Sequence, residues 1–262
     1  MVLLCAAWGL QQVVIKVTAP LMGAVLQAGI RSAIAALLVF GFAAWRGTPL
    51  FERDGTLRAG LVSGLLFGAE FFCIFVGLGH TTASRMAVFL YTAPIFTALG
   101  LHLFVPGEHL HRGQWIGVVL AFLGMALAFA DGIVSSSAHT STLLGDALGV
   151  LAGALWAATT IVVRGSKLSH APASKTLLYQ LAVSAVLLLV MALMAGQVHR
   201  VEVNGFVMAS LFYQSVLIAF ASYLIWFWLL RQYLASRLSV FSFLTPLFGV
   251  AFGVLLMHDQ VG

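Results

Sequence analysis

Apolar residues fill windows of about 20 residues along most of the chain, and short polar or turn-forming stretches separate these windows. A window of that length lets an α-helix cross the hydrocarbon core of a bilayer. Thr18-Ala19-Pro20, Gly47-Thr48-Pro49 and Ala171-Pro172 are typical separators. The pattern predicts nine membrane helices, near residues 2–17, 22–45, 58–79, 85–104, 113–131, 143–164, 174–195, 207–230 and 237–257.

The composition supports this interpretation and excludes most soluble classes. Of 262 residues, 61% are hydrophobic and 8% are charged, whereas soluble domains carry about a quarter charged residues. A bilayer removes the need for a polar surface, because lipid replaces water around the protein. The formal charge of +5 is scattered rather than clustered, which argues against a nucleic-acid partner. We therefore expect an all-α polytopic membrane protein whose environment is the lipid bilayer.

One stretch occurs twice. Residues 83–96 and 235–248 share the ungapped pattern A-S-R-x-x-V-F-x-x-x-x-P-x-F, and Trp8 and Trp156 lie alike on the first helix of each half. We interpret this as a duplication of a five-helix unit, with repeats at 1–131 and 143–262. Because five is odd, the second repeat is predicted to cross the membrane in the inverted sense. Its fifth helix, the tenth of the whole fold, is missing from this sequence.

The distribution of basic residues predicts the orientation. With a cytoplasmic N-terminus, the outer loops carry only Lys16, Arg85 and Arg200. The other loops then satisfy the positive-inside rule, and Arg85 and Arg237 fall on opposite sides, as inversion requires. The predicted cytoplasmic set is Arg46, Arg53, Arg58, Arg112, Arg164, Lys167, Lys175, Arg231 and Arg237.

With these features the chain resembles the EamA-type permeases of the drug/metabolite transporter superfamily. The residues that carry the resemblance are Trp8, Trp156, Glu70-Phe71, Ala83-Ser84-Arg85 leading to Pro94, Gly107-Glu108, and Gly117 to Gly124. The resemblance implies a ten-helix inverted repeat in the bacterial inner membrane that exports a small metabolite by alternating access. It favours amino acids or similar small zwitterions, aromatic ones among them. The absent tenth helix departs from the family and reflects either a truncated chain or a lost element.

Two other functions stay open. The chain would then be a uniporter or importer of another solute, such as a nucleotide-sugar-like or cationic compound, or a membrane enzyme or receptor subunit without flux. The sequence lacks G-x-x-x-x-G-K-[ST], which argues against ATP drive, and it lacks G-x-S-x-G and H-E-x-x-H. His109 and His111 beside Glu108 indicate a solvated turn rather than a metal site. We expect a monomeric carrier of a small-molecule substrate, without enzymatic activity, metal or cofactor.

Two charges lie inside predicted membrane helices, Arg31 and Glu70. Charged groups at that depth face protein or a water-filled cavity. One interpretation is a buried ion pair that sets the register of the second and third helices. The other is functional: Glu70 binds a substrate amine or exchanges a proton, and Arg31 binds a carboxylate. In the second repeat Ser222 and Val183 take their places, which favours the functional interpretation, because scaffold positions recur in both halves.

A second group of candidates is aromatic and polar, and a Trp with polar groups at i+3 and i+4 shares one helix face. The alternatives are core packing and a cavity wall that stacks on a flat or apolar group. The predicted substrate-binding set comprises Trp8, Gln11, Gln12, Arg31, Glu70, Tyr91, Trp156, Thr160, Tyr179 and Tyr223, with Thr159, Gln180 and Trp226 as further candidates.

Small and rigid residues predict how the helices meet and bend. The stripes Gly60-x-x-x-Gly64-x-x-x-Gly68 and Gly145-x-x-x-Gly149-x-x-x-Gly153 indicate close helix packing. Pro94 and Pro246 lie near the middle of predicted helices, where proline invites a kink. They form either static bends or a pair of hinges, one in each repeat.

Overall fold

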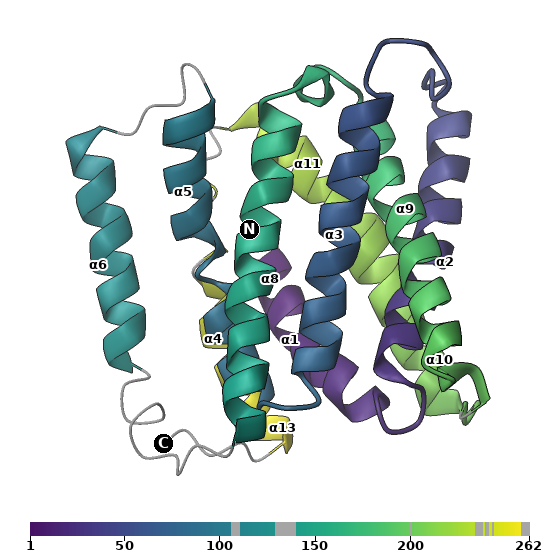
Figure 1. The fold of residues 1–262 in the computed structure, drawn as a ribbon, viewed down its shortest axis with the longest axis vertical. Coiled ribbons are helices and arrows are strands. Elements are labelled where there is room, and N and C mark those ends of the chain that lie inside the picture. The colour runs from purple at the N-terminus through teal and green to yellow at the C-terminus, as the bar shows by residue number, and fades with distance from the viewer. Residues whose placement is uncertain are drawn as a thin grey trace.

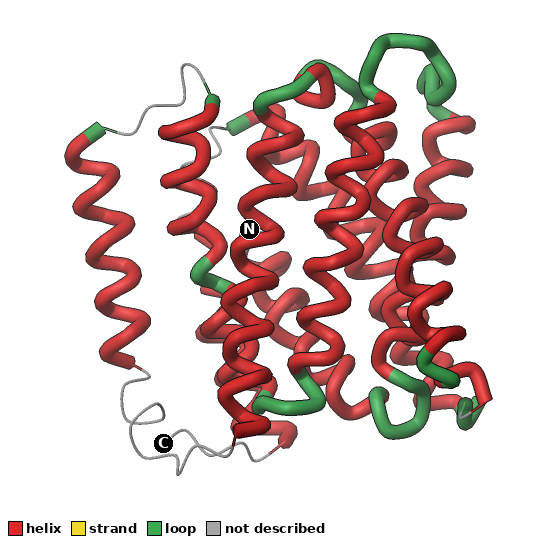
Figure 2. The backbone as a smooth tube through the Cα atoms, in the orientation of Figure 1, coloured by secondary structure: helices red, strands yellow, loops and turns green. Residues whose placement is uncertain are grey.

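The computed structural model describes residues 1–105, 111–128, 140–199, 201–233, 238, 241–242 and 244–257, and its regular elements there are all helical (Figures 1 and 2). Within these described ranges, six spans are long and apolar enough to cross a membrane, which confirms the all-α polytopic prediction. They are Ala24–Trp45, Leu57–Gly77, Ala83–Phe104, Thr142–Arg164, Ala173–Met194 and Gly205–Leu229.

Most element bounds lie within a few residues of the predicted ones, because the apolar windows set the helix lengths. The elements are α1 (Val2–Thr18), α2 (Ala24–Trp45), α3 (Leu57–Gly77), α4 (Ala83–Leu90), α5 (Ala93–Phe104), α6 (Arg112–Ala128), α8 (Thr140–Arg164), η1 (Lys167–Ser169), α9 (Ala173–Met194), η2 (Gln197–His199), α10 (Gly205–Phe212), η3 (Tyr213–Ser222), α11 (Tyr223–Gln232) and α13 (Leu244–Met257).

The helices run side by side along the long axis, with α6 at one edge of the bundle (Figure 1). α9 packs against α2 and α3, and α8 packs against α3, α4 and α5. On the far side of Figure 1, α1 packs against α13 and against η3. Connections at one end of the bundle join α2 to α3 and α8 to α9, and those at the opposite end join α1 to α2 and α3 to α4.

The first glycine stripe brings α3 against α9. A Cβ atom on Gly64 would lie 2.6 Å from the Cβ of Val183 and 2.7 Å from the carbonyl oxygen of Tyr179. A Cβ on Gly68 would lie 2.9 Å from a Leu187 methyl group. No side chain fits at these distances, so the backbones approach each other only because glycine is present.

The second glycine stripe does the same for α8. A Cβ on Gly145 would lie 2.7 Å from the Cβ of Thr81, in the turn between α3 and α4. A Cβ on Gly153 would lie 2.8 Å from the Thr92 hydroxyl. Both stripes therefore pack helices together, as the sequence predicts.

One predicted helix, 85–104, is wrong as a single element, because it is broken between α4 and α5. Tyr91 and Thr92 form a turn, and the Thr92 hydroxyl donates to the Phe89 carbonyl over 2.7 Å. Pro94 is the second residue of α5, where its missing N–H leaves no hydrogen bond unmade. It begins a helix rather than bending one.

Pro246 is the third residue of α13, and residue 243 before it lies outside the described part of the chain. A bend at Pro246 therefore stays a prediction. The second copy of the repeated stretch includes Arg237, which also lies outside the described residues, as do Arg200, Gly107-Glu108 and His109. The inverted relation of the two repeats likewise stays a prediction.

The sequence did not indicate a π-helix, yet η3 is one, inserted between α10 and α11. π-helical turns are rare and are frequent at functional sites. Here η3 ends at Ser222, next to Tyr223, and both residues face α1 or the cavity described below.

Candidate functional site

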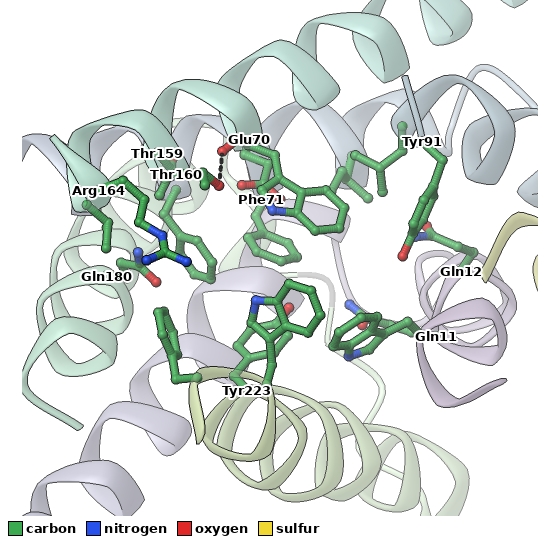
Figure 3. A pocket seen from close by; sticks show the side chains of 18 residues that line it. Gln11, Gln12, Glu70, Phe71, Tyr91, Thr159, Thr160, Arg164, Gln180 and Tyr223 are labelled. Atoms are coloured by element: carbon green, nitrogen blue, oxygen red, sulfur yellow. Dashed lines mark hydrogen bonds between the residues drawn. The ribbon is translucent and has the colours of Figure 1, made fainter. Parts of the chain in front are cut away.

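A cavity lies among α1, α3, α8, α9 and α11, beside the turn between α4 and α5 (Figure 3). It encloses about 920 Å³ of space between atoms, its open mouth included. Its lining comprises Trp8, Gln11, Gln12, Phe67, Glu70, Phe71, Ile74, Leu90, Tyr91, Trp156, Thr159, Thr160, Val163, Arg164, Gln180, Tyr223, Trp226 and Phe227.

Most of the predicted substrate-binding residues lie together in this lining, although they come from distant parts of the sequence. Arg31 and Tyr179 do not. The additional candidates Thr159, Gln180 and Trp226 also line the cavity. The residues from the predicted set that line it are Trp8, Gln11, Gln12, Glu70, Tyr91, Trp156, Thr160 and Tyr223.

Among the described residues that line the cavity, Glu70 is the only acidic one, and it is 5% exposed. Its direction follows from the glycine stripe, because Gly68, two residues earlier, faces α9 and residues two apart point to roughly opposite sides of a helix. No ion pair within 4.0 Å joins Glu70 to Arg31, although both residues are described. The register-setting pair considered from the sequence is therefore not formed in this conformation.

Aromatic rings form much of the wall. The indole N–H of Trp8 donates to the Ser222 hydroxyl over 2.9 Å, and its ring meets Trp226 edge to face at 5.5 Å between centroids. Tyr91 and Trp156 meet in the same way, also at 5.5 Å. Such contacts hold the rings in fixed orientations, so they offer preformed surfaces for stacking.

The polar lining groups have limited hydrogen-bonding freedom. The hydroxyls of Thr159 and Thr160 donate to the carbonyls of Leu155 and Trp156, at 2.9 and 3.1 Å, the second of which is dashed in Figure 3. Their protons are used, so they offer a ligand only oxygen lone pairs. The buried Oε1 of Gln12 has no partner among the described residues. These three groups therefore present acceptors to a ligand that carries donors.

Tyr179 packs outside the cavity. Its ring covers Gly60, where a Cβ would lie 2.6 Å from the ring, and its hydroxyl lies 3.4 Å from the Thr56 hydroxyl. The glycine stripe turns this face of α9 toward α3, and the cavity is on another side. The structure thus gives Tyr179 a packing position rather than a lining one.

Arg31 also lies outside the lining, behind Phe71. The side chain is fully buried, and the guanidinium carbon lies 3.8 Å from the centroid of the Phe71 ring. Phe71 itself lines the cavity, so one ring separates the cation from it.

Several lining residues have no sequence signal that marks them for binding. Most are apolar residues in apolar helices, where composition gives no signal. Arg164 was noted only for its charge, yet it lines the cavity as the last residue of α8. The cavity therefore extends from the helix centres toward the end of the bundle where α8 ends. The lining residues that the sequence did not single out for binding are Phe67, Phe71, Ile74, Leu90, Val163, Arg164 and Phe227.

The opposite end of the bundle is joined by a polar network, the closing network of Lys16, Thr81, Arg85 and Asp146. Lys16 Nζ donates to the Thr81 carbonyl over 2.5 Å, and the Thr81 hydroxyl donates to Asp146 over 2.8 Å. Arg85 forms a two-point ion pair with Asp146. Lys16 lies one helical turn beyond Gln12, on the side away from Arg164. The network therefore ties α1, α4 and α8 together beyond the end of the cavity that is remote from Arg164.

A family model described as the EamA-like transporter family matches residues 1–130 and 143–262. The chain belongs to the EamA-like transporter family. This agrees with the resemblance read from the sequence, and it makes the chain a membrane transporter by family. No group of three or more His, Cys, Asp or Glu suited to a metal ion occurs within the described residues.

Relatives of this EamA-like chain carry transporter names. An "Uncharacterized transporter" of Archaeoglobus fulgidus is 31% identical over 71% of this chain, which spans only 63% of that relative's length. A "Probable amino-acid metabolite efflux pump" of Escherichia coli is 28% identical over 99% of this chain and 86% of its own. The Bacillus subtilis "Uncharacterized transporter YoaV" is 24% identical over 97% of this chain and 86% of its own length.

The fold also matches a solved crystal structure. The TM-score is 0.71 at 16% sequence identity, and the match covers 99% of this chain and 86% of the other. At that identity the comparison establishes a shared fold only.

Proposed function

We propose that this EamA-like chain exports small metabolites, in particular amino acids including aromatic ones, across the bacterial inner membrane by alternating access without ATP hydrolysis. The family, the efflux-pump name of the Escherichia coli relative and the enclosed cavity support the proposal. The single observation that carries it is a lone carboxylate, Glu70, among aromatic rings and hydrogen-bond acceptors in a cavity between helices.

In this proposal Glu70 accepts hydrogen bonds from the substrate's ammonium group, since charge-assisted hydrogen bonds are the strongest available there. Gln12 Oε1, which has no partner among the described residues, accepts a further donor. Trp8, Trp156 and Tyr91 stack on the substrate's apolar part. A zwitterion with a flat or apolar side chain satisfies all three features.

Access to the cavity alternates between the two ends of the bundle. The end to which the cavity extends carries Arg46, Arg53 and Arg58, and the positive-inside rule assigns it to the cytoplasm. The conformation described here then faces inward, with the closing network sealing the outer end. Export requires that network to break and the Arg164 end to close.

The two predicted repeats supply the moving parts. The interrupted helix α4–α5 begins its second half at Pro94, and Pro246 occupies the matching position in the second repeat. An interruption at both positions, which at Pro246 stays a prediction, would suit a rocking motion about a central site.

Replacement of Glu70 by Gln tests the proposal. In reconstituted vesicles we expect Glu70→Gln to lower amino-acid counterflow about tenfold or more, because a charge-assisted hydrogen bond is lost. Glu202→Gln, which neutralises an exposed acid outside the cavity, is the matched control. Unchanged counterflow by correctly folded Glu70→Gln, across a range of pH, would remove Glu70 from the mechanism.

One observation favours a second candidate, the transport of a cationic compound. Glu70 meets the cavity directly, whereas Arg31 lies behind a ring. A cation carrier needs no site for a carboxylate and tolerates loss of Arg31. Counterflow of matched amines and amino acids separates the two substrates.

A further inference from the structure

The Arg31 guanidinium is buried without a hydrogen-bond partner. The side chain is 0% exposed, and none of its three nitrogens has a partner among the described residues. Its carbon lies 3.8 Å from the Phe71 ring centroid and 5.6 Å from that of Phe75. A ring face attracts the cation but accepts no conventional hydrogen bond, so the guanidinium keeps five unused N–H donors.

This arrangement is costly, because a buried charge is normally compensated by a partner that also bonds its donors. Glu70 and Tyr223 act on Arg31 electrostatically, and both line the cavity. Tyr223 lies close enough to interact with the guanidinium as a side-chain hydrogen-bonding group, but neither it nor Glu70 forms a hydrogen bond of 3.5 Å or less, or an ion pair, with Arg31. Arg31 is therefore held close to the cavity with its donors unsatisfied.

A single side chain separates the cation from the cavity. Phe71 follows Glu70 directly on α3 and lies beside it in the lining (Figure 3). Its ring packs against the edges of Phe67 and Phe75, at 4.8 and 6.3 Å between centroids. The cavity provides space on its other side, so rotation of this ring toward the cavity would uncover the guanidinium.

We propose that Arg31 is a carboxylate-binding subsite of the transport cavity and that the Phe71 ring covers it in the conformation described here. The proposal rests on the proposed transport function and specifies its substrate class as small amino-carboxylates. The ammonium group binds Glu70, and the carboxylate displaces the Phe71 ring and takes two parallel hydrogen bonds from Arg31. A planar guanidinium matches a carboxylate in this two-point geometry, which an amine or a neutral group cannot reproduce.

The spacing of the two groups supports this assignment. Glu70 and Phe71 are consecutive residues in one turn of α3. The carboxylate that would bind the ammonium group therefore lies next to the ring that covers Arg31. The ammonium and carboxylate groups of an α-amino acid are also close to each other, because one carbon atom carries both. Phe71 thus acts as a specificity-determining residue. Only a ligand that pairs with Arg31 offsets the free energy needed to displace the Phe71 ring.

The test compares phenylalanine with phenethylamine, its decarboxylated amine, in counterflow by purified and reconstituted protein. For Arg31→Met we expect the half-saturating concentration of phenylalanine to rise about 10- to 100-fold, the effect of losing charged hydrogen bonds. The half-saturating concentration of phenethylamine should change less than about twofold, because this amine has no carboxylate to bind Arg31. Arg46→Met is the matched control, because Arg46 follows the last residue of the same helix, lies near the Phe42 ring and is exposed. It should alter neither half-saturating concentration.

A second pair of variants keeps the proposal testable if Arg31→Met fails to fold. Arg31→Lys retains the charge but loses the two-point geometry. The half-saturating concentration of phenylalanine should therefore rise relative to that of phenethylamine. Phe71→Leu removes the covering ring, and the phenylalanine value should fall severalfold while the phenethylamine value stays constant, because the cation–π contact no longer competes.

The outcomes separate this proposal from the function on which it rests. Absence of counterflow by the wild-type protein for both solutes and for a wider solute panel would reject the transport proposal. Wild-type counterflow with the same phenylalanine-to-phenethylamine ratio in folded Arg31→Lys and Phe71→Leu would reject the subsite alone. Equal loss for both solutes in these variants would assign Arg31 to structure and would likewise overturn it.

Discussion

At the scale of single residues, the absence of a side chain decides how closely α3 approaches α9. Gly64 faces both the Val183 side chain and the Tyr179 carbonyl. The carbonyl belongs to the backbone of α9, so it cannot move aside as a flexible side chain could. The same approach holds α3 in the rotation that directs Glu70 into the cavity. Packing on one face of the helix therefore positions the carboxylate on the other.

Gly64→Ala tests this dependence. The added methyl group meets backbone at 2.7 Å, so we expect about 1–3 kcal/mol of destabilisation, typical of overpacking. Gly41→Ala on α2 is the control, because nothing lies within 4 Å of its Cβ position. Thermal unfolding in detergent measures both. Equal melting temperatures for the two variants would contradict close packing at Gly64.

At the scale of elements, an ion pair fastens the loop between α2 and α3 to α9. Lys175 is 2% exposed and donates to Asp54 over 2.8 Å and to the Glu52 carbonyl over 3.3 Å. Asp54 also accepts from the Thr56 N–H and hydroxyl, at 3.0 and 2.6 Å. The hydrogen bond from Lys175, followed by those from Thr56, holds the pKa of Asp54 far below its ordinary value of 3.8.

This lowered pKa predicts a pH dependence of stability. A carboxyl whose pKa is lower in the folded state stabilises the fold above its unfolded pKa and loses that contribution as pH falls further. Asp54→Asn should therefore lower the melting temperature at pH 7, and the difference from wild type should shrink below about pH 3.8. Glu52→Gln is the control, because only the backbone of Glu52 contacts Lys175. A difference that stays constant down to pH 3 would refute the assignment.

At the scale of the whole molecule, the two ends of the bundle differ. The cavity extends to Arg164 at one end, while the closing network joins α1, α4 and α8 at the other. Lys16 follows Trp8 at the same spacing as Arg164 follows Trp156, so the two basic residues correspond in the predicted repeats. Lys16 lies in the closing network, whereas Arg164 lines the cavity. An exchange of these roles would convert an inward-facing state into an outward-facing one.

Loss of the closing network should open the end of the bundle at which Asp146 lies. In a background with Cys5→Ala and Cys73→Ala, a cysteine at Gln12 reports access to a membrane-impermeant maleimide in vesicles of known orientation. We expect labelling from the Arg164 side only, and labelling from both sides after Asp146→Asn, because Arg85 and Thr81 lose their shared partner. Asp54→Asn, at the opposite end, is the control. One-sided labelling in Asp146→Asn would show that the network is not a gate.

The linear sequence by itself determined the number and placement of most helices, because hydrocarbon thickness sets the length of an apolar window. It also identified the close packing of Gly64 and the lining positions of Glu70, Trp8 and Trp156. In an apolar helix a polar or small residue is retained only where its neighbours accommodate it. Such local requirements can be read without coordinates.

Only the tertiary structure decided what these residues meet. It broke the helix before Pro94, placed Tyr179 on Gly60 and put the Phe71 ring between Arg31 and the cavity. It also brought Asp146 to Arg85 and Lys16 to Thr81, residues with no shared pattern in the sequence. These outcomes depend on the rotation of each helix against its neighbours, which is set by packing between segments far apart in the chain.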